Sequence, residues 1–102
     1  MLKTQIQTGE VYTLKLISGE EILGKVVESN DKTILLSKPL ILTIQATEQG
    51  TSMMFVPLGL TYNPDLSNEL EFKHEHILYS FLTPSEFEKQ YTTQTSGIQI
   101  AL

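Results

Sequence analysis

The sequence predicts an all-β domain with one short C-terminal helix, organised as a small, strongly bent, five-stranded antiparallel barrel. Three observations support this prediction. Apolar and polar residues alternate along short segments that turn residues separate. Gly19 and Gly24 lie five positions apart in a stretch otherwise typical of sheet, which predicts a tight turn followed by a sharply curved strand. The length of 102 residues leaves room for a single domain, residues 1–102, with one modest core.

Five alternating segments are expected to form the strands of a barrel core that covers about residues 10–82. These segments are residues 11–17, 21–28, 33–44, 53–60 and 69–82. Pro39 interrupts the third segment and cannot donate to a ladder, which predicts a bulge or an edge there. The alternation of the last segment is lost around residues 73–75, and such a break in phase predicts a bend.

A single helix is expected over about residues 84–91. Its start signals are Thr83 as the N-cap, Pro84 as the first helical residue and Glu86 as the partner in a capping box. Phe87 and Tyr91 lie four residues apart on one face of this helix, and we expect that face to dock on the barrel. A polar linker and an alternating apolar segment follow as a tail over residues 92–102.

Composition restricts the class of function. The net charge of −5 and the absence of arginine argue against broad electrostatic capture of nucleic acid, which depends on clustered cations. The absence of cysteine excludes disulfides and thiolate metal sites and favours an intracellular location. No apolar run is long enough to span a bilayer and the N-terminus lacks the apolar region of a signal peptide, so we expect no membrane partner.

The first glycine-containing segment resembles the first motif of the Sm-like proteins. In that motif a glycine turn is followed five residues later by a second glycine within a strand, then by an Asn/Asp turn and an apolar strand. Gly19 and Gly24 fall at the two glycine positions, and Asn30 and Asp31 fall in the turn. By this resemblance, Gly24 lets the second strand bend into the barrel.

The segment of residues 70–81 resembles the second Sm-like motif, in which an apolar strand meets a basic residue, a tight turn and an apolar closing strand. Lys73 occupies the position of the usual Arg, and His74 that of the usual Gly. The two motifs together cover about residues 10–82, and the chain resembles short Sm-like proteins of tailed bacteriophages. The base-reading Asn of the family has no counterpart, because Ile34 or Leu35 stands in its place.

The resemblance implies a cyclic homo-oligomer whose central pore contacts single-stranded RNA, in the cytoplasm of a bacterial host. The RNA-contacting residues that it implies lie in two turns and are Asn30, Asp31, Lys32, Thr33, Lys73, His74 and His76. The subunit interface that it implies lies in the closing strand and comprises Ile77, Leu78, Tyr79, Ser80 and Phe81. The alternative is a structural or adaptor module of phage origin, in which the same ring contacts proteins and binds no RNA.

Other chemistries find less support in the sequence. His74 and His76 suggest a metal site, but zinc requires a third protein ligand and no cysteine is present, so a polar cluster in a turn is the preferred interpretation. Glu20 and Glu21 are interpreted as solvated turn residues rather than as an acid pair. No Ser or Thr lies in a nucleophile motif. We therefore expect no enzymatic activity, no catalytic residues, no metal and no cofactor.

Overall fold

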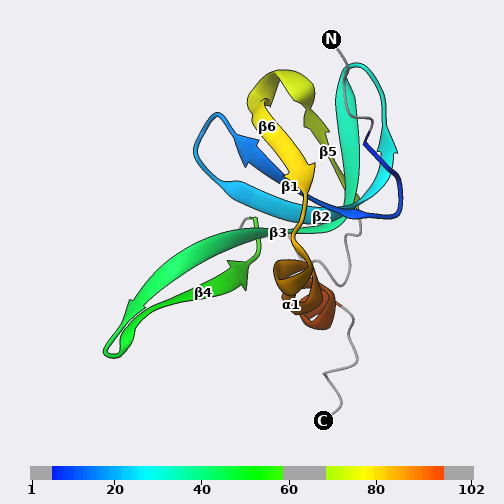
Figure 1. Cartoon of the computed structure of the whole chain (residues 1–102). Coiled ribbons are helices and arrows are strands. Elements are labelled where there is room, and N and C mark those ends of the chain that lie inside the picture. Colours follow the sequence, from blue (N-terminus) through cyan, green and yellow to red (C-terminus); the bar gives the residue numbers. More distant parts are fainter. Residues whose placement is uncertain (1–5, 59–68, 96–102) are drawn as a thin grey trace.

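A computed structural model describes residues 6–58 and 69–95 of the chain. These residues form mostly antiparallel β-sheet with one helix near the C-terminal end (Figure 1). The elements in chain order are β1 (Val11–Leu16), β2 (Glu21–Ser29), β3 (Thr33–Thr47), β4 (Gly50–Val56), β5 (Glu69–Lys73), the 3₁₀ turn η1 (His74–His76), β6 (Ile77–Leu82) and α1 (Ser85–Thr95). The predicted all-β class with one short helix is confirmed. No helix among the described residues is long and apolar enough to cross a membrane.

The strands follow the order β4-β3-β2-β1-β6, and β5 pairs with β3. β3 pairs with β2 along one edge, while β5 and β4 lie end to end along its other edge. Among the described strands no ladder joins β5 to β6, so the sheet does not close into a barrel. The bend predicted in the segment of residues 69–82 is confirmed, because η1 divides that segment into two strands with different partners.

The two glycines of the first motif act in different ways. Gly19 adopts a φ of +107° in the turn between β1 and β2, a conformation that favours glycine. Gly24 lies in β2 where the register against β3 shifts, opposite Lys38 and Pro39. Lys38 has a φ of +49°, and two residues of β3 there oppose one of β2. The bulge predicted at Pro39 is therefore confirmed.

The core has two parts because successive residues of β1 and β2 point to opposite faces of the sheet. One buried cluster comprises Tyr12, Leu14, Ile22, Val26, Ile34 and Leu36. The other lies beneath α1 and comprises Val11, Leu23, Leu40 and Tyr91, with Phe87 packed against it. The prediction that Phe87 and Tyr91 dock on the sheet is confirmed, and the Tyr91 hydroxyl donates to the carbonyl oxygens of Ser37 and Lys38 at 2.9 and 2.7 Å.

Two expected boundaries and one expected side-chain role differ from the structure. α1 continues to Thr95, so the first four residues of the expected tail are helical and the rest lie outside the described residues. The fourth strand is Gly50–Val56 rather than residues 53–60, of which residues 59 and 60 are also outside the described part. The hydroxyl of Thr83, expected as the N-cap, instead pairs with the hydroxyl of Thr13 at 2.9 Å in a buried contact.

Candidate functional site

The turn between β2 and β3 is organised by the side chain of Asn30. Its Oδ1 accepts hydrogen bonds from the backbone N–H groups of Lys32 at 2.8 Å and Thr33 at 2.9 Å. The backbone N–H of Asn30 in turn donates to the carbonyl of Thr33 at 2.9 Å. An Asn side chain that replaces backbone partners in this way is typical of a tight turn. The amide oxygen of Asn30 is therefore committed to the turn, while Lys32 remains exposed.

The second predicted turn lies directly beside the first. Thr33 pairs with Lys73 in the β3–β5 ladder, and the backbone N–H of His74 donates to the carbonyl of Lys32 at 2.9 Å. The Nε2 atom of the His74 ring lies 3.0 Å from the carbonyl oxygen of Asn30. The two turns border a hollow of about 470 Å³, lined by Asp31, Lys32, Thr33, Lys73, His74 and Glu75. Residues more than 40 positions apart in sequence thus form one candidate site, which we call the paired-turn site.

The charges of the paired-turn site alternate in sign. Lys32 and Lys73 supply two exposed cations, and Asp31 and Glu75 supply two exposed carboxylates. Such a site attracts a polyanion far less than a cluster of cations would. It does combine two ammonium groups with the imidazole of His74, and groups of these two types can bind phosphate and stack on a base.

His76 does not line this hollow, although the sequence grouped it with the other residues. It occupies the far end of η1, where its backbone carbonyl accepts from the N–H of Ile17 at 2.9 Å. Its ring is largely exposed, with Nε2 4.0 Å from a carboxylate oxygen of Glu75. Within residues 6–58 and 69–95, no group of three or more His, Asp or Glu side chains could hold a metal ion.

Glu20 lies in the turn between β1 and β2, and Glu21 is the first residue of β2. The hydroxyl of Ser18 donates to the carboxylate of Glu20, and this bond, together with one from the backbone N–H of Glu20, lowers the pKa of that carboxyl group below its usual value. Glu20 is fully exposed and ionised at neutral pH. Glu21 pairs with Lys15 across the hairpin.

The predicted interface strand, β6, exposes apolar side chains. It pairs with β1, and no other described strand pairs with its outer edge. Four of its side chains are exposed by 40–60%: Leu78, Tyr79, Phe81 and Leu82. Ser80 is also exposed, while Ile77 packs partly against the core. The rings of Tyr79 and Phe81 stack with their centroids 6.1 Å apart, which forms an aromatic patch on one face of the strand.

Every second residue of β6 directs its backbone N–H and C=O groups away from β1, toward the outer edge of the sheet. The N–H of Thr83 donates to the carbonyl of Val11 at 2.9 Å. Phe81 and Tyr79 lie two and four residues before Thr83 in the same ladder, so their N–H groups also point toward β1. In an antiparallel pair the backbone groups alternate between the partner strand and the other side. The N–H of Ser80 therefore points away from β1, toward the open edge.

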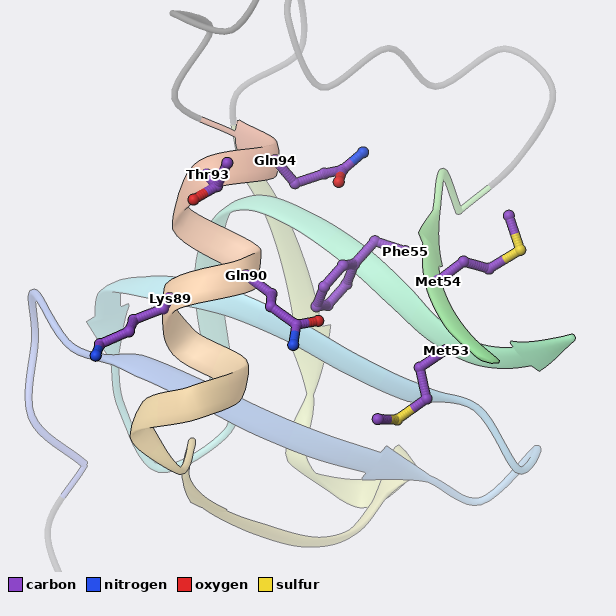
Figure 2. Close-up of a pocket in the computed structure, with 7 residues that line it drawn as sticks. All are labelled: Met53, Met54, Phe55, Lys89, Gln90, Thr93 and Gln94. Atoms are coloured by element: carbon purple, nitrogen blue, oxygen red, sulfur yellow. The ribbon is translucent and has the colours of Figure 1, made fainter. Parts of the chain in front are cut away.

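A pocket between β4 and α1 was missed by the sequence-based reasoning. It measures about 480 Å³ and is lined by Met53, Met54, Phe55, Lys89, Gln90, Thr93 and Gln94 (Figure 2). The adjacent methionines Met53 and Met54 could have indicated an apolar surface. Their position beside a helix more than 30 residues later, however, depends on how α1 crosses the sheet.

The wider comparisons add no relative from which a role could be transferred. No model of a known protein family matches the chain, and no curated protein matches it. The assignment of a function consequently depends on the paired-turn site, the exposed strand β6 and the pocket between β4 and α1.

Proposed function

We propose that the chain is an Sm-like module, bent into a small barrel, that assembles into a closed homo-oligomeric ring and contacts single-stranded RNA through its paired-turn sites in the cytoplasm of a bacterial host. The observation that carries the proposal is the outer edge of β6, with which no described strand pairs. That strand combines outward-pointing backbone groups with four exposed apolar side chains.

The composition of β6 is typical of an edge strand that pairs with another strand. Exposed edges are usually protected by charged residues, proline or bulges, because bare edges pair with other chains. The segment of residues 77–82 contains no charged residue and no proline. At the other end of the sheet β4 and β5 each pair with β3 alone among the described strands. Since the two open edges differ, a contact between them is head to tail, and such contacts close into rings when the rotation permits.

RNA contact is supported by the position of the paired-turn site. Its two ammonium groups, on Lys32 and Lys73, border one hollow together with the ring of His74. A ring would repeat this group of residues once per subunit around its axis, so weak individual contacts would add through multivalency. The lysines of all subunits together would make the affinity depend on ionic strength, while stacking on His74 would add a contribution that salt does not screen.

Two measurements test the proposal. Multi-angle light scattering of the intact chain at micromolar concentration is expected to give a multiple of the 11.5 kDa subunit mass. Fluorescence anisotropy with short A-rich and U-rich oligonucleotides is expected to show binding at low salt that is lost steeply as salt rises. A subunit mass of 11.5 kDa would contradict the ring, and absence of binding at low salt would contradict the RNA contact.

A second function, that of a protein adaptor, is favoured by the hairpin of β3 and β4. This hairpin extends away from the rest of the sheet (Figure 1), and it exposes Ile44 by 69%, Met53 by 48% and Met54 by 38%. Glu48 at its tip is the single charged residue between residues 41 and 56. If the protein is an oligomer but binds neither oligonucleotide at low salt, the result would favour this adaptor function over RNA binding.

A further inference from the structure

We propose that His74 makes RNA binding at the paired-turn site depend on pH, so that the site holds the phosphates of single-stranded RNA more tightly when the imidazole is protonated than when it is neutral. This inference rests on the proposed RNA contact and assigns a regulation to the same site. It uses neither the outer edge of β4 nor that of β6, so it applies to one subunit as well as to a ring.

The hydrogen bond between the two turns determines which nitrogen of the His74 ring carries the hydrogen. Nε2 lies 3.0 Å from the backbone carbonyl oxygen of Asn30. A carbonyl oxygen only accepts hydrogen bonds, so Nε2 must be the donor in this contact. The neutral ring is therefore the tautomer in which Nδ1 has no hydrogen, and Nδ1 is the atom that gains the proton as pH falls.

The ring can gain this proton without disturbing the contact between the two turns. The bond to Asn30 uses the Nε2–H group, which both charge states of the ring contain. The backbone beside the ring is held separately, because the N–H of His74 donates to the carbonyl of Lys32 at 2.9 Å and Thr33 pairs with Lys73. Protonation consequently changes the charge of the site while its geometry is kept.

The charges around the ring cancel until that proton is added. The charged and titratable groups near His74 are Asp31 and Lys32 on the β2–β3 turn, Lys73 at the end of β5, and Glu75 and His76 within η1. The segment after β1 contacts η1 through Ile17, which has no charge. The two ammonium groups and two carboxylates that border the hollow sum to zero, so protonation of His74 gives the hollow a net positive charge.

Histidine is the residue type in this hollow whose charge changes near neutral pH. Histidine side chains change charge between about pH 5 and 8, whereas unperturbed carboxyl groups titrate at about pH 4 and lysines at about pH 10. The chain contains two histidines and no cysteine. The second histidine, His76, does not line the hollow. It therefore serves as a control that has the same chemistry in a different position.

The first test measures fluorescence anisotropy with a U-rich oligonucleotide, because uracil neither gains nor loses a proton near neutral pH. Wild type should bind at least about threefold more tightly at about pH 5.5 than at about pH 7.5. Its salt slope should be steeper at the lower pH by about 0.7 for each phosphate that the ring contacts. His74→Gln, whose amide can still donate to Asn30, should bind equally at both pH values. His76→Gln should keep the pH dependence of wild type.

The second test follows the ring signals of both histidines by NMR during a pH titration, with and without the oligonucleotide. A ligand that prefers the protonated ring must in turn favour protonation of that ring. The oligonucleotide should therefore raise the midpoint of the His74 titration and leave that of His76 unchanged. This readout uses the wild-type chain, so it decides the question even if His74→Gln fails to fold or to bind.

Other outcomes overturn the inference in distinguishable ways. If wild type binds equally at both pH values, or if the midpoint of His74 does not move, the pH dependence is wrong while the RNA contact stands. A pH dependence that persists in His74→Gln would place the proton elsewhere. Light scattering should give one mass at both pH values, and a mass that changes with pH together with the affinity would attribute the effect to assembly. Absence of binding at both pH values would contradict the RNA contact itself.

Discussion

A methyl group added to Gly24 would lie 2.9 Å from the Cβ of Leu36 and 3.0 Å from its Cδ1. Leu36 is completely buried, so its side chain cannot move out into solvent without disturbing its neighbours in the core. The nearer contact involves a Cβ atom, which moves only with the backbone of β3. Close approach of β2 and β3, rather than a left-handed conformation, is therefore what requires glycine at this position.

The first prediction follows from that contact. Gly24→Ala should lower the free energy of unfolding by about 1–3 kcal/mol, because one of the two strands must shift to admit the methyl group. For a domain of this size each kcal/mol corresponds to a fall in melting temperature of roughly 4–8 °C. Lys25→Ala, at the exposed neighbouring position, is the control and should melt close to wild type. If Gly24→Ala melts like Lys25→Ala, the two strands are not packed as closely as described.

Several features of the fold could be predicted because their cause is local. The turn glycine Gly19, the bulge at Pro39 and the bend at residues 73–75 each follow from what a few neighbouring residues can or cannot do in a strand. The pairing of the two turns of the candidate site was not local, and only the resemblance to a two-motif family suggested it. The hydrogen bond from the N–H of Ile17 to the carbonyl of His76 depends on the path of η1. The alternation of apolar and polar residues predicts strands but does not determine that path.

The buried pair of Thr13 and Thr83 shows why local signals can mislead. Thr83 has the sequence pattern of a helix N-cap, yet its hydroxyl pairs with that of a residue 70 positions earlier. The contact exists because β6 returns beside β1, and its last residues bring Thr83 next to that strand. A capping pattern describes only the next few residues, so it contains no information on this competing partner.

The second prediction concerns this pair. Both residues are buried, with Thr13 4% and Thr83 5% exposed, and replacing one with Val leaves the other hydroxyl without its partner. Each single variant should lose about 1–3 kcal/mol of unfolding free energy, whereas the double variant Thr13→Val, Thr83→Val should recover much of that loss. Urea unfolding at one fixed protein concentration measures all four proteins, and additive losses would show that the hydroxyls do not interact.

The third prediction concerns RNA. Lys73→Ala and Lys32→Ala each remove one cation from the paired-turn site, so each should weaken oligonucleotide binding and reduce the slope of its salt dependence. The double variant should lose more than either single variant. Lys25→Ala removes an exposed cation that does not line this hollow and should bind as wild type does. Binding that survives the double change, with an unaltered salt slope, would place the RNA elsewhere on the protein.

The fourth prediction separates the open edge of β6 from its ladder with β1. Proline at position 80 removes an N–H that points away from β1, and edge strands tolerate proline at such positions. Ser80→Pro should therefore keep the fold, as measured by circular dichroism, but yield smaller species by light scattering. Tyr79→Pro instead removes a donor from the β1 ladder and should destabilise the subunit itself. Equal effects of the two changes on folding would contradict the alternation assigned to this strand.

A charge on the exposed face of β6 tests the same interface without changing the backbone. Leu78 is 60% exposed in the single subunit, so Leu78→Lys should barely alter the folding of one subunit. Within a ring, that side chain would lie beside a neighbouring strand, where an unpaired ammonium group is costly. We expect the mass to fall toward 11.5 kDa at micromolar concentration. Val27→Lys, at a position 39% exposed on the inner strand β2, is the matched control and should keep the wild-type mass. An oligomer that tolerates Leu78→Lys as well as Val27→Lys would mean that the subunits meet through a surface other than β6.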